Sequence, residues 1–250
     1  MIMINDGTNK NAYDITSFLM IGQSNMAGRG DFGDVQAIEN ENCFMLRMGR
    51  WQKMSEPINP DRAIFGSDFH SGISLGASFA DGYAKHFTKK IGLIPCADGG
   101  TSISEWLPGE VLFDHAVMMT KLAMRTSNFG GIIWHQGESD CNEENFALYE
   151  ERLIRMITEI RKELNAEELP FIFGELSEKI SPNWNLCDYP GKINSTLREI
   201  EKNIPNCRLV SAEGLTLKPD GIHFDSPSLR ELGSRYFKAY LELTHKNNDF

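Results

Sequence analysis

Apolar residues along this chain gather in short runs of strand length that alternate with longer segments of helical period. The strand-length runs cover Phe18 to Ile21, Cys43 to Met48, Ile91 to Ala97, Gly131 to His135 and Phe171 to Leu176. A shorter run, Arg208 to Ala212, is either a sixth strand or an extended approach to a site. This alternation predicts a parallel sheet with crossover helices, because parallel neighbours need a long connection between them.

The segments between these runs repeat their apolar residues at helical spacing. Leu75, Phe79, Tyr83 and Phe87 recur every four residues and predict a helix over 75–89. Residues 145–164 carry one apolar stripe with Glu and Arg opposite, and 195–202 and 228–244 are predicted to be the last two helices. The span 50–72 has no clear period and is predicted to be a long surface loop that shapes a pocket.

No internal repeat, low-complexity tract or Pro/Gly-rich linker divides the chain, so residues 1–250 are predicted to form a single α/β domain. The hydrophobic content of 41% and the charged content of 24% fit a soluble globular protein. The net charge of −10 argues against nucleic acid as a partner, because binding phosphates requires clustered Lys and Arg.

Several features bear on compartment and cofactors. No apolar run approaches the ~20 residues that span a bilayer, and the first residues lack the pattern of a signal peptide. We therefore expect a cytoplasmic protein without a membrane partner. The five cysteines are scattered without a CxxC pair, which favours buried free thiols over disulfides or a zinc site. No HExxH, dinucleotide-binding or P-loop motif occurs, so we expect neither a metal nor a cofactor.

The segment Gly22-Gln23-Ser24-Asn25-Met26 directly follows the apolar run that ends at Ile21. This order places the Ser24 hydroxyl at the carboxyl edge of the sheet, where ligands bind in open α/β folds. Ser24 is either a nucleophile or the N-cap of the next helix, a position for which Ser is favoured. Taken alone, the segment favours the capping role.

A nucleophilic serine needs a base that is itself oriented by a third group. Asp220 and His223 lie three residues apart in Asp220-Gly221-Ile222-His223, with a glycine between them to tighten the turn. In such a turn the carboxylate can fold back onto one ring nitrogen of His223, and the opposite nitrogen then faces Ser24. The alternative is a surface turn with an incidental histidine.

Acyl transfer also needs donors for the oxyanion that develops on the carbonyl. The predicted strand over 91–97 is followed by Gly99 and Gly100, whose backbone can approach a ligand closely. The strand over 131–135 is followed by Gln136, whose side-chain amide is a donor. The alternatives are an ordinary strand-to-helix turn and a polar loop.

Together, the segments GQSNMAG (22–28), GGTSISEW (99–106), WHQGESD (134–140) and DGIH (220–223) resemble the SGNH-hydrolase superfamily. More closely they resemble its carbohydrate acetylesterase branch, which includes acetylxylan esterases and the sialate O-acetylesterase-like domain. The resemblance extends from about Phe18 to the C-terminal helix. It implies a three-layer α/β/α sandwich with a flavodoxin-like, mainly parallel five-stranded sheet.

The resemblance also implies residue roles. Ser24 would be the nucleophile, His223 the general base and then acid, and Asp220 the residue that orients His223. The oxyanion hole would comprise the backbone N–H of Ser24, an N–H of the glycine pair at Gly100, and the side chain of Gln136. Gln136 stands where most of the superfamily has Asn.

Other polar and aromatic residues near these segments have two interpretations each. Glu138, Asp140 and Gln23 are expected to support the site, although Glu138 could instead orient His223. His70 either contacts substrate or is a surface histidine. Trp106 either forms an apolar wall for substrate or packs in the core, and His135 is expected to be a core histidine.

These residues predict a serine esterase that removes O-acetyl groups from a carbohydrate, similar to acetylxylan esterases, through an acyl-enzyme. Its partner would be an acetylated oligosaccharide or glycoside. The alternatives are a sialate O-acetylesterase, a short-chain lipid or thioester acyl hydrolase, and a carbohydrate-binding domain on a decayed hydrolase fold. The sequence identifies neither the sugar nor the oligomeric state.

Overall fold

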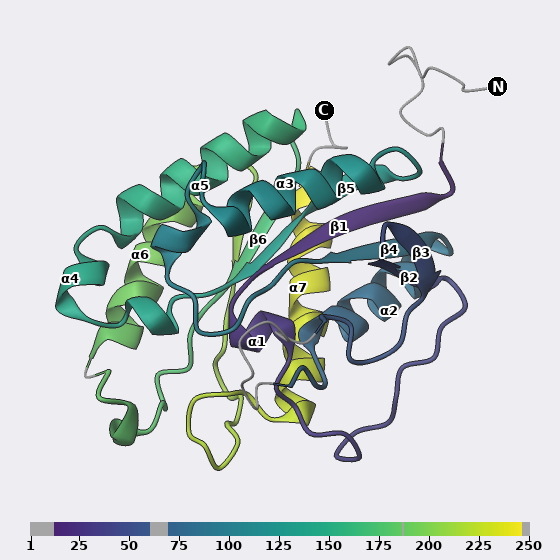
Figure 1. Ribbon diagram of the computed structural model, residues 1–250. Helices are drawn as coiled ribbons and strands as arrows, with labels where there is room; N and C mark the ends of the chain where they lie inside the picture. Colours follow the sequence, from purple (N-terminus) through teal and green to yellow (C-terminus); the bar gives the residue numbers. More distant parts are fainter. Residues whose placement is uncertain (1–12, 61–69, 187, 247–250) are drawn as a thin grey trace.

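A seven-stranded sheet forms the centre of the molecule (Figure 1). The computed structural model describes residues 13–60, 70–186 and 188–246. The strand order is β3-β2-β4-β1-β5-β6-β7, and every pairing is parallel except that of β3 with β2. The strands are β1 (Ile15–Gly22), β2 (Cys43–Arg47), β3 (Arg50–Lys53), β4 (Lys90–Pro95), β5 (Asn128–His135), β6 (Phe171–Gly174) and β7 (Cys207–Val210).

The strand order explains where a site can form. The strands β4-β1-β5-β6-β7 follow the flavodoxin-like order, in which the first strand lies between the second and the third. The strand order therefore reverses at β1, which lies between β4 and β5. Such a reversal opens a crevice at the carboxyl ends of β1 and β5. The mainly parallel α/β sandwich is confirmed, with seven strands instead of five.

The additional strand β3 lies within the span 50–72 that we predicted to be a loop. Met48 and Gly49 both have positive φ, 49° and 74°, and form the two-residue turn of a β2–β3 hairpin. The residues of β3 are mostly exposed and polar, as is common for an edge strand, so no apolar run marks it. The run near Arg208 is confirmed as a strand, β7.

Helices cover both faces of the sheet (Figure 1). The helices α2 (Leu75–Phe87) and α7 (Ser226–Lys246) pack on one face, and α3 (Val111–Ala123), α5 (Tyr149–Leu164) and α6 (Tyr189–Asn203) pack on the other. Along β1, Phe18 and Met20 pack in the core on the side of α2 and α7. Leu19 and Ile21 pack in the core on the side of α3, α5 and α6. Burial on both faces is why the residues from Phe18 to Ile21 of β1 are all apolar.

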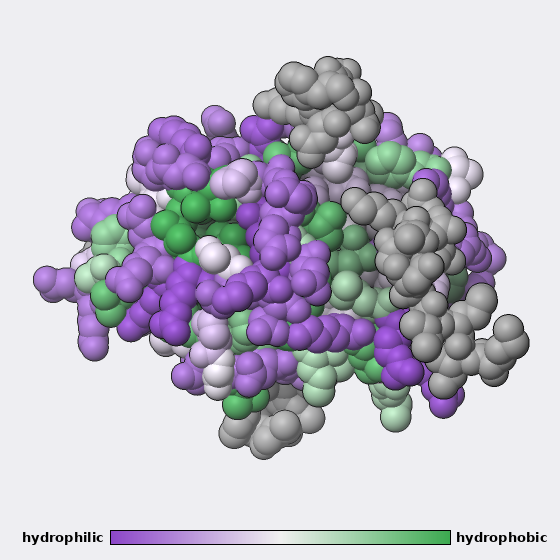
Figure 2. Space-filling model, turned by 90° about the horizontal axis from the view of Figure 1, so that it is seen from above, coloured by the Kyte–Doolittle hydropathy of each residue, from purple (hydrophilic) through white to green (hydrophobic). Residues whose placement is uncertain are grey.

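Short helices follow several strands at the sheet's carboxyl edge. They are α1 (Ser24–Ala27), α4 (Glu143–Phe146) and the 3₁₀ turns η2 (Ile103–Trp106), η3 (Glu138–Asp140) and η4 (Pro182–Trp184). The surface in Figure 2 is largely hydrophilic with separate hydrophobic patches. Among the described residues, no helix is long and apolar enough to cross a membrane. The four described cysteines are buried and free, and Cys187 lies outside the described residues.

Candidate active site

Ser24 begins the short helix that follows the central strand. The strand ends at Gly22, which has a φ of +130°, and a Cβ atom there would lie 2.1 Å from the carbonyl oxygen of His135. Only glycine fits this close approach. Gln23 occupies the N-cap, Ser24 is the first helical residue, and no side chain caps this helix. The Ser24 hydroxyl is thus not used for capping.

Asp220 holds His223 through both its ring and its backbone. The Asp220 Oδ2 atom lies 2.9 Å from Nδ1 of the His223 ring. Its Oδ1 atom accepts hydrogen bonds from the backbone N–H groups of Ile222 and His223, each at 3.0 Å. Gly221, with a φ of +73°, makes the turn that permits this. The Nε2 atom of the ring is left on the edge opposite the carboxylate.

The electrostatic environment suits a neutral base beside an ionised carboxylate. Burial lowers the pKa of His223 below its usual value and outweighs Asp220, which raises it; Arg29 and Lys218 lower it further. Burial raises the pKa of Asp220, but the hydrogen bonds from Ile222 and His223 more than offset this and lower it overall. His223 is therefore neutral and Asp220 charged at neutral pH.

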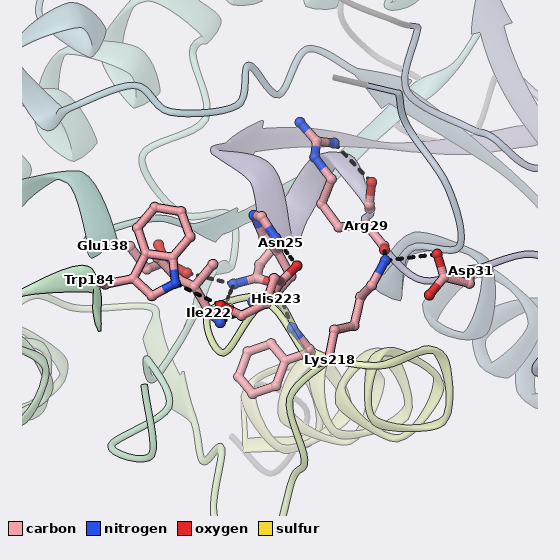
Figure 3. Close-up of polar contacts among 11 residues, drawn as sticks. Asn25, Arg29, Asp31, Glu138, Trp184, Lys218, Ile222 and His223 are labelled. Atoms are coloured by element: carbon pink, nitrogen blue, oxygen red, sulfur yellow. Dashed lines mark hydrogen bonds and ion pairs between the residues drawn. The ribbon is translucent and has the colours of Figure 1, made fainter. Parts of the chain in front are cut away.

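Asn25 ties the His223 loop to the helix that carries Ser24 (Figure 3). Its Oδ1 atom accepts a hydrogen bond from the backbone N–H of Phe224 at 3.0 Å, and its Nδ2 atom donates to the carbonyl of Ile222 at 3.4 Å. The structure thus places the loop of Asp220 and His223 against the helix that begins at Ser24. Within the described residues, no hydrogen bond joins Ser24 to His223; such bonds often tighten only with substrate.

Gly99 lies beside the Ser24 side chain, in the loop that follows β4. A Cβ atom at Gly99 would lie 3.6 Å from Cβ of Ser24 and 2.4 Å from Nη2 of Arg29. Gly100 has a φ of +78°, and a Cβ atom there would meet nothing within 4 Å. The loop therefore passes close to Ser24 with its backbone uncovered at Gly100. A backbone donor from this glycine pair stays a prediction.

Gln136 has a different arrangement from the one expected of an oxyanion donor. Its side chain is fully buried, and its amide nitrogen donates to the carbonyl of Thr101 at 2.9 Å and to Oδ2 of Asp140. Both amide hydrogens are thus engaged. Asp140 also accepts a hydrogen bond from the N–H of Ile103 at 2.9 Å, and burial raises its pKa to about 6. Gln136 and Asp140 therefore tie the loops after β4 and β5 together.

Gln23 and Glu138 support the start of α1. The Gln23 Oε1 atom accepts hydrogen bonds from the N–H groups of Gly137 and Ser139, each at 3.3 Å. Glu138 is 4% exposed, and its Oε1 atom accepts a hydrogen bond from Asn25 at 2.6 Å. Burial raises the pKa of Glu138. Glu138 contacts Asn25, and the carboxylate that contacts His223 is that of Asp220.

A cleft of about 360 Å³ opens beside His223 and Asp220. Its lining includes the cationic residues Arg29 and Lys218, the exposed Phe32, and His70. Figure 3 shows Lys218, which donates to the carbonyl of Arg29 at 2.7 Å and pairs with Asp31 at 2.8 Å. Larger hollows of about 700 and 760 Å³ lie elsewhere and include none of the predicted catalytic residues.

Two other candidate residues, Trp106 and His135, lie in the core. Trp106 is fully buried, donates to Oγ1 of Thr101 at 3.0 Å and packs edge-on against Trp134, so it belongs to the core. His135 is also fully buried, and its Nδ1 atom lies 3.1 Å from the Tyr236 hydroxyl.

Trp184, which the sequence did not single out, is 46% exposed and donates to the carbonyl of Asp220 at 2.8 Å. Its contact anchors the turn that carries Asp220. Among the described residues, no group of three or more His, Cys, Asp or Glu is arranged to hold a metal ion.

Comparisons with known proteins identify a family that matches most of this chain. The family model of carbohydrate esterases described as sialic acid-specific acetylesterases matches residues 14–242. A probable carbohydrate esterase of Arabidopsis thaliana is 29% identical over 244 residues, which cover 90% of this chain and 89% of the relative. The X-ray structure of an Arabidopsis thaliana protein has a TM-score of 0.80 at 27% identity, covering 92% of this chain and 98% of that one.

Two more distant structures share the fold. NanS has a TM-score of 0.75 at 15% identity, covering 94% of this chain and 98% of its own. A carbohydrate acetylesterase from Xanthomonas citri has a TM-score of 0.60 at 20% identity, covering 92% of this chain and 57% of its own. At these identities the likeness concerns the architecture alone.

Proposed function

Because the chain belongs to the sialic acid-specific acetylesterase family of carbohydrate esterases, we propose that it is a serine esterase that releases acetate from an O-acetylated sugar. The observation that carries the proposal is the contact of Asp220 with His223 in a loop that Asn25 ties to the residue after Ser24. Nucleophile, base and orienting carboxylate are the three parts that acyl transfer by a serine needs.

In the proposed reaction, Oγ of Ser24 attacks the carbonyl carbon of the acetyl ester while Nε2 of His223 takes its proton. The tetrahedral intermediate then collapses: the bond to the sugar oxygen breaks, and His223 returns the proton to that oxygen. This leaves an acetyl group on Ser24. Water attacks the acetyl-enzyme with His223 again as base, and acetate and free Ser24 are released. Asp220 keeps the proton of the neutral ring on Nδ1.

The oxyanion would be stabilised by backbone donors. The first N–H groups of a helix have no partner within the helix, and Ser24 is the first residue of α1. The loop at Gly99 and Gly100 passes beside the Ser24 side chain and offers the second donor. Gln136 would act by holding this loop in place through Thr101, since its amide hydrogens are already engaged.

The proposal also concerns which O-acetylated sugar is the substrate. An acetylated xylo-oligosaccharide suits an acetylxylan esterase-like enzyme. O-acetyl sialic acid is a second candidate, because it carries a carboxylate and the cationic Arg29 lines the cleft beside His223. Lys218 in the same cleft is already paired with Asp31. Acetate release from the two substrates, measured side by side, distinguishes them.

The proposal is tested by hydrolysis of a small aryl acetate. Ser24→Ala should lower kcat by roughly 10⁴-fold or more, as loss of the nucleophile does in serine hydrolases. Equal rates for the variant and the wild-type protein would refute the proposal. A series of longer acyl esters tests the lipid or thioester alternative, which predicts that activity persists with chain length. A carbohydrate-binding domain would release no acetate.

A further inference from the structure

The side chain of Asn25 belongs to a buried network that the proposed reaction steps do not use. Asn25 is 1% exposed and contacts three partners from two distant segments: Glu138, the carbonyl of Ile222 and the N–H of Phe224 (Figure 3). The last two flank His223 on either side. One amide group therefore fixes the backbone before and after the proposed base relative to the residue that follows Ser24.

Phe224 and Glu138 together determine which way round the Asn25 amide lies. A backbone N–H only donates, so the amide oxygen faces the N–H of Phe224 at 3.0 Å, and the amide nitrogen faces Oε1 of Glu138 at 2.6 Å. In the reversed orientation, oxygen would face oxygen at Glu138 and an N–H would face the N–H of Phe224. Burial raises the pKa of Glu138, and the hydrogen bond from Asn25 opposes this by favouring the carboxylate.

We propose that Asn25, oriented by Glu138, is a positioning residue that sets the placement of the His223 ring relative to Ser24. This inference rests on the proposed function, which gives His223 and Ser24 their roles. A misplacement of about 1 Å far from the chemistry can lower a rate about 100-fold. Neither Asn25 nor Glu138 lines the cleft beside His223, so the network should act on kcat and leave KM nearly unchanged.

The test reverses the polarity of the hydrogen bond between positions 25 and 138. Asn25→Asp keeps an acceptor for the N–H of Phe224 but places oxygen against oxygen at Glu138. We expect kcat on an aryl acetate to fall about 100-fold, with KM within about threefold of wild type. Glu138→Gln keeps an acceptor for Asn25 and should change kcat less than about tenfold.

The double variant Asn25→Asp/Glu138→Gln supplies the opposite pairing, because the new amide at position 138 donates to the new carboxylate at position 25. It should recover kcat to within about tenfold of wild type, since the hydrogen bond between positions 25 and 138 is restored in the reversed sense and the bond from the N–H of Phe224 is kept. Only the longer bond to the carbonyl of Ile222, at 3.4 Å, is lost. A merely structural role predicts that kcat falls and recovers only as far as Tm does, whereas a positioning role changes kcat in variants whose Tm is unchanged. Thermal unfolding of each variant shows whether its fold persists.

Two results would overturn the inference: an Asn25→Asp protein with kcat within threefold of wild type, or a double variant no more active than Asn25→Asp. If Asn25→Asp does not fold, the variant Glu138→Met is tested in its place. Glu138→Met removes the acceptor for the Asn25 amide and should lower kcat about tenfold. An unchanged kcat in Glu138→Met would overturn the inference. Failure of the proposed function has a different signature, namely wild-type hydrolysis that Ser24→Ala leaves unchanged.

Discussion

Replacing Asp220 with asparagine should abolish most activity while leaving the fold intact. In the structure, one oxygen of Asp220 accepts two backbone N–H groups at 3.0 Å each, which only an oxygen can do. The asparagine oxygen therefore takes that position, and its NH₂ group faces Nδ1 of His223, where Oδ2 now lies at 2.9 Å. The ring must then accept at Nδ1 and carry its proton on Nε2, so it no longer takes the Ser24 proton.

The expected loss in kcat is about 10⁴-fold, the effect of the same substitution in the serine-protease triad. This corresponds to about 5 kcal/mol of activation free energy. The stability should change by less than about 1 kcal/mol, because the Asp220 side chain is 35% exposed and solvent screens its interaction with His223.

The assay compares kcat on an aryl acetate and the Tm of wild type, Asp220→Asn and the matched control Glu138→Gln, which also replaces a carboxylate with an amide. We expect a large loss of kcat in the first variant alone. An Asp220→Asn protein with more than a tenth of wild-type kcat, together with an inactive Glu138→Gln, would mean that Glu138 orients the base.

Three further predictions concern charge and space around the site. Arg29→Gln removes a positive charge that disfavours protonated His223, so the acidic limb of the kcat/KM profile should move to higher pH; an unmoved limb contradicts this. Gly99→Ala should fold with little change in Tm and shift the limb, since its Cβ displaces the guanidinium of Arg29 from its place near His223; a profile identical to wild type would argue against this placement. Burial lowers the pKa of His135 to about 4 in the folded protein, from about 6.5 in the unfolded chain. Between these pH values the unfolded state binds more protons than the folded state. The free energy of unfolding should therefore fall by up to about 3 kcal/mol as the pH is lowered from about 6.5 to about 4. His135→Gln should flatten this slope in urea titrations at pH 7 and 4.5, and equal slopes would refute the assignment.

The elements that could be predicted from the sequence are those with a clear hydrophobic signature. Strand β1 is buried on both faces from Phe18 to Ile21 and is apolar there, and α5 shows its buried stripe against charged residues. Helix α3 was not predicted, because Val111, Met118 and Leu122 are apolar yet exposed and blur its period. Strand β3 was missed because its pairing depends on the turn at Gly49 and not on apolar residues.

The order of segments along the chain was enough to predict which loops meet at the site, but not which side chains bond to each other. Segments that follow parallel strands meet at one edge of the sheet, which is how Ser24 and the Gln136 loop were placed together. The partners of Gln136 depend on loop geometry, although the spacing of four residues to Asp140 was a signal for a local contact. The bond from Phe224 to Asn25 spans 199 residues, and no pattern in a single sequence indicates it.

The central claim is that Ser24 is the activated nucleophile. A fluorophosphonate reagent, which forms a stable bond with activated serines, tests it by peptide mass spectrometry and residual activity. We predict one phosphonyl group per chain, located on Ser24, with activity lost in proportion to labelling and no labelling of Asp220→Asn on the same timescale. Loss of activity with the label on another residue, or full activity with Ser24 labelled, would contradict the account.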